Sequence, residues 1–515
     1  SLSDKPVGLH RCARRMHGNL GGLRQWNRSR IEAWNGIFRE SVKVMPSKEL
    51  GRVSHNFYPY AQDQQFLLPP SLHEWVREDS LERFVSDVVD HLDEEGRLAS
   101  FYAPYRKDGW GHPGYHPVML LKVLLYGYAV GIRSSRKVAA ALERDIAFRY
   151  LAANQQPDFR TISAFRKRHL EDFHAVFTEV VRLCAEAGLV KLGRVAVDGR
   201  KVKGDAALEE NRTRKRIEKE IGRILEEAEE VDREEDEKYG EDRRGDELPE
   251  GLRTREERLE KLKRARAELD ARERELKEAQ AGKLEERARE EERTGRKKRG
   301  RKPKPPEDVE LSEDQKVNLT DPESQILKTR NGWVQGYNGQ IGVDCESQVI
   351  VTEHVTSEAN DVQQLKLLVE GCEEVNGRVP DELLADAGYW SEENLEKLPE
   401  GTEPFIATTK DWKRRKALRE QGPPRGRIPK DFGPKERMER KLRTKRGREA
   451  YKERSSSVEP VFGQMVMRGL GHFLLRGLEG SSGEWSLFTV THNLLKLWRA
   501  AWRPETSLAV TPTQV

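Results

Sequence analysis

GRVAVDGRKV, residues 193–202, interrupts a long helical pattern with one that is typical of a buried β-strand. Val195, Ala196 and Val197 form its apolar part, and we predict that this short strand ends at Asp198-Gly199. A carboxylate at the end of a strand has catalytic potential, because the sheet fixes its position. On this pattern alone, a structural turn or cap explains the aspartate at least as well as catalysis does.

Two other segments carry acids in comparable settings. In LLADAGY, residues 383–389, a second short buried strand ends at Asp386, and in YKERSSSVEPVFG, residues 451–463, Glu459 lies on a predicted helix. If the two strands are neighbours in one sheet, three carboxylates converge beside that helix. Such hard oxygen donors suit Mg²⁺, and two such ions can promote an in-line phosphoryl transfer. Glu453 is a second candidate for the helical acid, but Glu459, placed before the apolar VFG, fits better.

Four residues near these segments allow two interpretations each. Asp344 could approach a metal from an adjacent strand, although an exposed strand aspartate is the simpler interpretation. Trp390 could stack on an unpaired base or pack in the core. His116 and His492 could be functional, but a lone histidine on a helix is usually a packed or capping residue.

Before the first strand, apolar side chains recur at helical intervals and predict an all-helical domain over residues 61–190. The basic side chains named below make it the candidate DNA-binding domain. His116-Pro117 opens a buried helix, and two shorter helices follow at 134–144 and 161–169. These two could form a helix-turn-helix-like unit whose basic side chains face phosphate or base edges: Arg160, Arg166, Lys167 and Arg168. A helical bundle with a charged surface explains the same pattern equally well.

A sharp change in composition to Glu, Arg and Lys marks residues 208–294, which follow the first catalytic-core segment, 191–207. We predict an inserted antiparallel coiled-coil hairpin with a break at 239–251. Its two apolar stripes are Ile217, Ile221, Ile224, Leu225, Ala228 and Val231, and Leu259, Leu262, Leu269 and Leu276. Such charge runs are usually solvated helix faces rather than a partner-binding surface.

The segment 295–318 is predicted to be a basic, extended linker. Its Arg299 and Arg301 would favour the phosphate backbone of DNA, although a simple linker is the plainer interpretation.

The remainder of the catalytic core is predicted to span residues 319–502. Apolar and polar residues alternate over 337–356 and predict a β-hairpin. Further helices are expected at 364–372, 391–398, 457–470 and 483–502, whereas the basic stretch 412–448, rich in Gly and Pro, is expected to be loop. Residues 503–515 are predicted to be a flexible tail.

Composition limits the class of protein. Of the 515 residues, 35% are charged and 36% are hydrophobic, so some segments must be solvated rather than packed. The net charge of +4 indicates little about nucleic acid by itself, because the charges are unevenly distributed. Residues 1–60 are predicted to be a flexible basic arm.

Neither a membrane span nor a cysteine framework is expected. The apolar run 118–130 is interrupted by Lys122 and falls short of the roughly 20 residues that a span requires. We therefore expect a cytoplasmic protein without a membrane partner. The cysteines are widely separated and predict reduced, mostly buried thiols rather than a zinc site or disulfides: Cys12, Cys184, Cys345 and Cys372.

Several ordered blocks of sequence together resemble the bacterial insertion-sequence transposases with an RNase H-like DDE core. The blocks are QDQQFLLPPSL (62–72), HPVMLLKVLLYGY (116–128), VAVDGRKVK, QGYNGQIGVD, LLADAGYWSEEN, VEPVFGQ, RGLGHFLLRGL and WSLFTVTHNLLKL. The resemblance covers about Asp63 to Leu497, interrupted by the predicted coiled-coil insertion. It implies an α/β fold with a mixed RNase H-like sheet flanked by helices, and an N-terminal all-helical domain.

The resemblance also implies roles for individual residues. Asp198, Asp386 and Glu459 would be the catalytic triad that binds Mg²⁺, or Mn²⁺ as an alternative, as two ions. Tyr451 and Arg454 look like the tyrosine and arginine that precede the glutamate, and the arginine would contact DNA phosphate.

The function that follows is cleavage at transposon ends and joining of the freed 3′ hydroxyl to target DNA. The partner is double-stranded DNA, the location is the bacterial cytoplasm with its nucleoid, and the active form is a homodimer or larger. One alternative is a nuclease of the same fold, which would give no joined product. Another is a domesticated or inactive DNA-binding protein, because Met465 to Met467 stand where a basic residue is expected.

Overall fold

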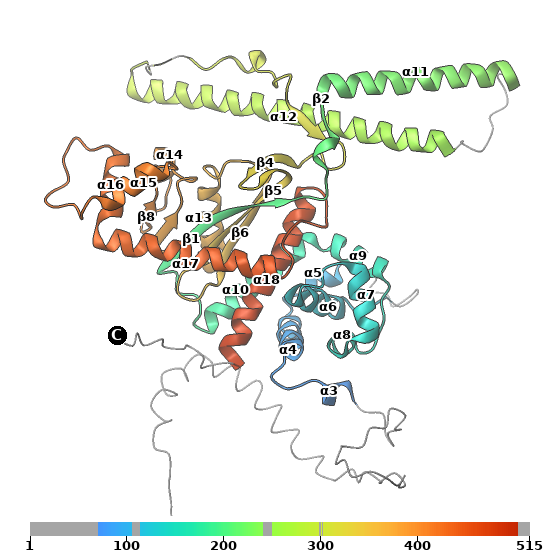
Figure 1. The fold of residues 1–515 in the computed structure, drawn as a ribbon, viewed down its shortest axis with the longest axis horizontal. Helices are drawn as coiled ribbons and strands as arrows, with labels where there is room; N and C mark the ends of the chain where they lie inside the picture. The colour runs from blue at the N-terminus through green and yellow to red at the C-terminus, as the bar shows by residue number, and fades with distance from the viewer. Residues whose placement is uncertain (1–70, 106–113, 240–249, 298–299, 301, 503–515) are drawn as a thin grey trace, which may run out of the picture.

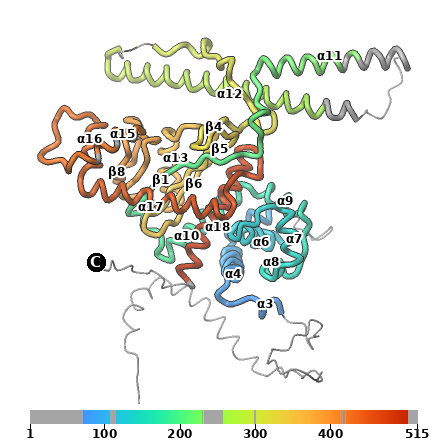
Figure 2. Tube along the Cα trace, viewed as in Figure 1, coloured from blue at the N-terminus to red at the C-terminus, as the bar shows by residue number. Residues whose placement is uncertain are grey.

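A computed structural model describes residues 71–105, 114–239, 250–297, 300 and 302–502. The predicted arm over 1–60 and tail over 503–515 lie outside the described residues, as do Cys12, Arg299 and Arg301. Within the described part, a helical region, a mixed sheet flanked by helices and a long helical arm can be followed along the chain in Figure 1 and in the trace of Figure 2.

The helical region confirms the helices expected from apolar periodicity. Its elements are α3 (Leu72–Trp75), α4 (Leu81–Glu94), α5 (Ala99–Tyr102), α6 (Pro117–Val130), α7 (Ser135–Arg144), α8 (Ile146–Leu151), α9 (Phe159–Arg168) and α10 (Leu170–Glu186). Pro117 opens α6, and Gly131 ends it with a φ of 83° that favours glycine. Asp158 caps α9 by accepting from the Arg160 N–H at 2.7 Å. Helix α6 is buried on nearly every side, because α4, α8 and the last helix of the core all pack against it.

The sheet has six strands: β1 (Arg194–Lys203), β4 (Gln325–Thr329), β5 (Gly332–Asp344), β6 (Ile350–Thr356), β7 (Glu382–Ala385) and β8 (Glu403–Ile406). Their order is β4-β5-β1-β7-β8, with β6 also paired to β5. β7 runs parallel to β1 and β8, whereas β5 is antiparallel to β1, β4 and β6. The predicted mixed sheet and the β5–β6 hairpin are therefore confirmed.

The first strand is longer than the sequence predicts. We expected it to end at Asp198-Gly199, but β1 continues to Lys203 because β5 pairs with it from Val195↔Asp344 to Lys203↔Gly336. On its other side, β7 pairs only with Arg194 to Ala196. Asp198 consequently lies inside a strand, yet just beyond the end of its parallel neighbour.

Helices pack against the sheet. The predicted helices at 364, 391 and 483 are confirmed as α13 (Gln364–Asn376), α14 (Glu392–Glu396) and α18 (Leu478–Trp502). The helix expected at 457–470 is α17 (Lys445–Met467) and begins twelve residues earlier, because Thr444 caps it by accepting from the Gly447 N–H. Apolar density, on which the prediction depended, starts only near Val458.

The expectation of loop over 412–448 holds for 421–433 and is wrong for most of the remainder. This stretch contains α15 (Trp412–Glu420) and α16 (Pro434–Arg443). Long basic side chains hold the intervening loop: Arg440 donates to the Gly426 carbonyl at 2.6 Å, and Arg448 donates to the Gln421 carbonyl at 2.6 Å. Arginines that look like a solvated patch in the sequence therefore satisfy backbone acceptors.

The inserted segment forms an arm of two helices, α11 (Arg214–Tyr239) and α12 (Glu250–Thr294), that projects beyond the sheet in Figure 1. Arg214 pairs with Asp270 at 2.7 Å and Glu220 with Arg258 at 3.1 Å, so these helices run antiparallel. Their shared core contains Ile217, Ile224, Leu262 and Leu269, with Ile221 and Leu259 packed against it. Leu225 and Leu276 are exposed and do not belong to the stripes that we predicted. The break was predicted over 239–251, but Tyr239 still belongs to α11, and α12 already begins at Glu250. Residues 240–249 and the side chains of Ala228 and Val231 lie outside the described residues.

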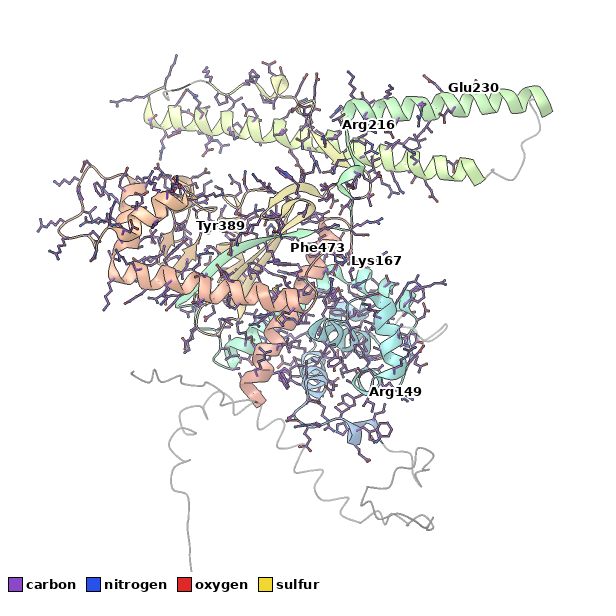
Figure 3. The ribbon with its side chains drawn as sticks, viewed as in Figure 1. Arg149, Lys167, Arg216, Glu230, Tyr389 and Phe473 are labelled. Atoms are coloured by element: carbon purple, nitrogen blue, oxygen red, sulfur yellow. The ribbon has the colours of Figure 1, made fainter. Side chains whose placement is uncertain are left out.

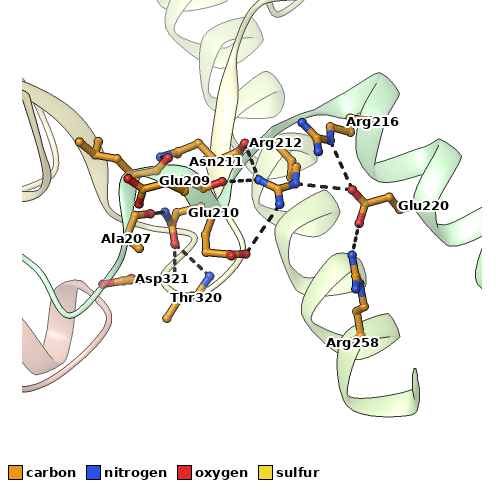
Figure 4. A network of polar contacts seen from close by, with 12 residues as sticks. Ala207, Glu209, Glu210, Asn211, Arg212, Arg216, Glu220, Arg258, Thr320 and Asp321 are labelled. Atoms are coloured by element: carbon orange, nitrogen blue, oxygen red, sulfur yellow. Dashed lines mark hydrogen bonds and ion pairs between the residues drawn. The ribbon is translucent and has the colours of Figure 1, made fainter. Parts of the chain in front are cut away.

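A small sheet and an ion-pair network join the arm to the core. β2 (Asn211–Thr213) pairs antiparallel with β3 (Lys316–Asn318) at the base of the arm. There, Glu220 on α11 accepts from Arg258 of α12 and lies 3.5 Å from Arg212 of β2 (Figure 4). The described part of the predicted linker is held against the arm, since Gln280 donates to the Lys304 carbonyl at 2.9 Å.

Three cysteines lie among the described residues. Cys184 and Cys372 are buried, Cys345 is half-buried, and all three are free thiols, as expected.

No single helix of the described residues is long and apolar enough to span a membrane; α6 and α7 reach that length and apolar content only as a pair bent by 99°.

His492 on α18 is a packed histidine. Its ring is buried, and Nε2 lies 2.9 Å from the Gln348 carbonyl oxygen, which can only accept. Nε2 therefore carries the hydrogen, and Nδ1 faces the Arg468 guanidinium at 3.4 Å. Burial, followed by the charge of Arg468, lowers the pKa of His492 to about 3.

This depressed pKa predicts acid sensitivity. Below pH 6.5 the histidine of the unfolded chain takes up a proton that His492 in the folded chain does not bind, so stability is present above that pH and falls as the pH drops, by at most about 1.4 kcal/mol per unit. We expect His492→Gln to lose less free energy of unfolding than the native chain between pH 7.5 and 5.5. Urea unfolding at both pH values measures this, and equal losses would contradict it.

Candidate active site

Two aspartates meet where β7 ends. In the parallel pairing of β1 with β7, Ala196 lies opposite Leu384, and Asp198 and Asp386 each lie two residues beyond that pair. Burial raises the pKa of Asp198 above its usual value; the Arg454 charge opposes this and the like charge of Asp386 adds to it. The two carboxylates are therefore close enough to interact, at an edge that the end of β7 leaves open.

The partners of each carboxylate fix its orientation. Asp198 Oδ1 accepts from the Gly199 N–H at 2.9 Å, and its Oδ2 accepts from Arg454 Nη1 at 3.0 Å. Asp386 Oδ1 accepts from the Gly388 N–H at 2.6 Å. The family resemblance implies that Arg454 contacts DNA phosphate; in the structure its guanidinium is the counter-charge of Asp198.

Glu459 lies on the same helix as Arg454 and is exposed. It lines a cavity of about 720 Å³ together with Tyr451 and Arg454. The alternative acid, Glu453, forms an ion pair with Arg194 at 3.1 Å and lines a different cavity. Among the acids of α17, Glu459 is thus the one that lines the same cavity as Arg454, the residue that forms an ion pair with Asp198.

The carboxylates of Asp198 and Asp386 are of the ligand type that divalent cations such as Mg²⁺ bind. Asp198 and Asp386 present carboxylate oxygens, which Mg²⁺ and Mn²⁺ prefer, and their mutual repulsion in a partly buried place favours a positive partner. In the part of the chain that the structure describes, no three acidic, histidine or cysteine side chains are close enough together to hold a metal ion. Arg454 supplies the positive charge, and Glu459 would have to approach to complete a set of three ligands.

The cavity that Glu459 lines also has several basic side chains in its wall. Side chains from the β4–β5 turn, α16 and α17 line it, and the basic ones are Arg330, Arg443, Arg448, Lys452 and Arg454. Tyr451 shares its wall, and the Arg454 guanidinium lies 5.9 Å from the centre of the Tyr451 ring. A wall of this composition attracts phosphate.

The remaining candidates fall in different environments. Arg160, Lys167 and Arg168 are exposed on α9 (Lys167 is labelled in Figure 3). Arg166 is not available to DNA: it is buried and donates to the Arg133 carbonyl at 3.0 Å. The sequence prediction treated this basic run as one surface, but a helix turns Arg166 towards the core.

Other predicted residues are structural. Asp344 is not exposed: it is buried at the end of β5, opposite Val195 rather than Asp198, and accepts from the N–H groups of Lys191 and Leu192. Trp390 packs against the main hydrophobic core, as one of its two interpretations predicted. His116 is the residue before α6, and its ring packs edge-on against Tyr102.

Two residues near the aspartates escaped the sequence analysis. Asp361 accepts from the side-chain amides of Asn338 and Gln340, and Tyr389, fully buried, donates its hydroxyl to Gln340. Burial raises the pKa of Tyr389 well above its usual value, with the charges of Asp361, Asp198 and Asp386 adding to the shift. The sequence could have indicated Tyr389, because it lies in the LLADAGY motif three residues after Asp386. It could not have indicated Asp361, which stands in a turn without an apolar pattern around it.

Comparison with known proteins gives two family matches. Residues 70–168 match a transposase domain (DUF772), and residues 320–494 match a transposase DDE domain. No curated protein and no solved structure matches the chain. The first match covers the helical region; the second covers most of the sheet, Asp386 and Glu459, whereas Asp198 precedes it. DDE transposases act on DNA and generally depend on divalent metal ions. The chain belongs to this family of insertion-sequence transposases and has an RNase H-like core.

Proposed function

We propose that this transposase cleaves transposon ends and joins the freed 3′ hydroxyl to target DNA at a site formed by Asp198, Asp386 and Glu459. The observation that carries the proposal is the meeting of Asp198 and Asp386 beyond the last β1–β7 pair, beside a cation-rich cavity that Glu459 borders. Both reactions are phosphoryl transfers, so one site can perform them.

The three carboxylates would hold Mg²⁺ or Mn²⁺, as two ions. When bound, the metal lowers the pKa of an attacking water or hydroxyl and stabilises the leaving oxygen. The chain's own residues bind and orient the strand. Arg454 is positioned to exchange Asp198 for a phosphate when a cation neutralises that carboxylate. Arg330 and Lys452 would contact the backbone of the strand that enters the cavity, and Tyr451 would support the wall between them.

DNA would also contact the helical region, which we propose as the DNA-binding domain over 61–190. Exposed Arg160, Lys167 and Arg168 on α9 support this, because basic side chains on one short helix favour phosphate contacts. The two-helix arm, within the proposed insertion 208–294, would pair protomers in a homodimer or larger assembly on two ends.

A cleavage and joining assay tests the proposal. Duplex DNA carrying the element's own terminal sequence is incubated with the chain and Mg²⁺, and products are separated on a denaturing gel. We expect both cut strands and strands joined to target DNA. Cut strands without joined product would indicate a nuclease of the same fold, and binding without any cutting would indicate a protein that only binds DNA.

A further inference from the structure

A fourth acid, Asp361, approaches the two aspartates from the turn between β6 and α13. Its Oδ1 accepts from Asn338 Nδ2 at 2.8 Å and from Gln340 Nε2 at 2.9 Å, and Lys201 Nζ lies 3.5 Å away. Asn338 and Gln340 belong to β5 and are fully buried. Three donors therefore fix the position of the Asp361 carboxylate.

Asp361 reaches the site from the face of the sheet opposite to Arg454. In the β1–β5 pairing, Asp198 lies opposite Ile341 and Gly199 lies opposite Gln340. Successive residues of a strand point to opposite faces, so Asp198 projects towards α17, where Arg454 meets it, and Gln340 projects towards Asp361. Arg454 therefore approaches the open edge beyond β7 from one face of the sheet, and Asp361, a third aspartate, approaches it from the other face.

Two glycines make room for this approach. A Cβ at Gly388 would lie 2.7 Å from Asp386 Oδ1 and 3.0 Å from Asp361 Oδ2, so these two oxygens border the same methyl-sized space. A Cβ at Gly199 would lie 3.0 Å from Asp361 Oδ1. Asp361 therefore fits against Gly199, which follows Asp198, and against Gly388, two residues after Asp386. One of its oxygens is bound to β5 and the other lies towards Asp386.

We propose that Asp361 is a positioning residue of the active site, whose fixed negative charge strengthens the binding of a divalent cation by Asp198 and Asp386. It does not have to touch the cation, because a charge a few ångströms away in a partly buried place acts strongly on it. The inference rests on the proposed function, since it requires a cation at that pair. Lys201, the only cation paired with Asp361 among the described residues, has the opposite effect: it offsets part of the charge that Asp361 provides.

Mn²⁺ binding to the full chain without DNA, followed by calorimetry, tests the inference. Asp361→Asn keeps the size of the side chain and removes its charge, and we expect it to weaken Mn²⁺ binding about tenfold. Lys201→Met should change affinity in the other direction and tighten binding several-fold, which a purely structural role of Asp361 does not predict. In the cleavage assay, Asp361→Asn should need about ten times more Mg²⁺ for half-maximal rate and stay within a few-fold of the native rate at saturation.

Two reference variants separate this inference from the function on which it rests. Asp344→Asn removes the charge of a buried aspartate that accepts from the N–H groups of Lys191 and Leu192 and from those of Glu346 and Ser347 in the β5–β6 turn, so it should lower stability without changing Mn²⁺ affinity. Asp198→Asn should remove most of the binding. Native-like Mn²⁺ affinity in both Asp361→Asn and Lys201→Met, with loss in Asp198→Asn, would overturn the role of Asp361 and leave the proposed function standing. Native-like affinity in Asp198→Asn as well would overturn both.

Discussion

Asp198→Asn and Asp386→Asn are each expected to lower the rate of metal-dependent strand cleavage by at least about a thousandfold, or about 4 kcal/mol in the activation free energy. The amide keeps the shape of each side chain but removes the charge that a divalent cation requires. Asp198 lies within β1, and Asp386 keeps an oxygen to accept from the Gly388 N–H, so the sheet should remain intact. Initial rates on end-containing DNA at saturating Mg²⁺ measure the loss.

Asp381→Asn is the matched control. Asp381 is an exposed aspartate immediately before β7, at the strand end away from Asp386, and its substitution should leave the cleavage rate unchanged. DNA binding by all three variants should match the native chain, because Arg160, Lys167 and Arg168 are untouched. An Asp386→Asn variant that cuts at a native rate would remove Asp386 from the site.

The largest effect on stability is expected at the contact between the helical region and the core. Glu484 on α18 is fully buried and accepts from Arg133 Nη1 at 2.9 Å, from the Tyr128 hydroxyl at 3.1 Å and from the Leu474 N–H at 2.6 Å. Arg166 completes the network by donating to the Tyr128 oxygen at 3.2 Å. Glu484→Gln leaves Arg133 buried without its counter-charge, so we expect a loss of about 3–5 kcal/mol in the free energy of unfolding.

Urea unfolding followed by tryptophan fluorescence gives that free energy. Glu479→Gln changes an exposed glutamate on the same helix and should have little effect. The double variant Arg133→Met with Glu484→Leu should recover much of the loss, because it removes both charges at once. If Glu484→Gln unfolded together with the native chain, the network would not hold the helical region to the core.

The sequence predicted the helices and strands where apolar periodicity is strong, such as α6, α18 and β7. It misplaced the end of β1, because pairing with β5 is a property of a distant segment and not of residues 198–203. It also shortened α17, since the first three turns of that helix carry mainly polar residues after a threonine cap. The apolar pattern of a segment indicates which of its residues are buried. Both errors concern residues whose conformation depends on hydrogen bonds, with β5 for the end of β1 and with the Thr444 cap for the start of α17.

For the candidate active site, the sequence patterns and the family resemblance predicted Asp198, Asp386 and Glu459. It missed Asp361 because nothing local distinguishes an aspartate in a turn. The signal was indirect: Gly199 follows Asp198 and Gly388 stands two residues after Asp386, and only the structure shows that both leave space for a third carboxylate. Arg166 illustrates the opposite error: the sequence analysis treated the basic side chains of this helix as one exposed surface, although Arg166 is buried.

The most direct test of the central claim, that these carboxylates bind the catalytic metal, is the cleavage rate of Asp386→Cys with Mg²⁺ and with Mn²⁺. A thiolate is a poor ligand for Mg²⁺ and a better one for softer ions. The account predicts that Asp386→Cys is inactive with Mg²⁺ and regains cleavage with Mn²⁺, whereas Asp386→Asn stays inactive with both. Equal, native-like cleavage by Asp386→Cys with Mg²⁺ would contradict it.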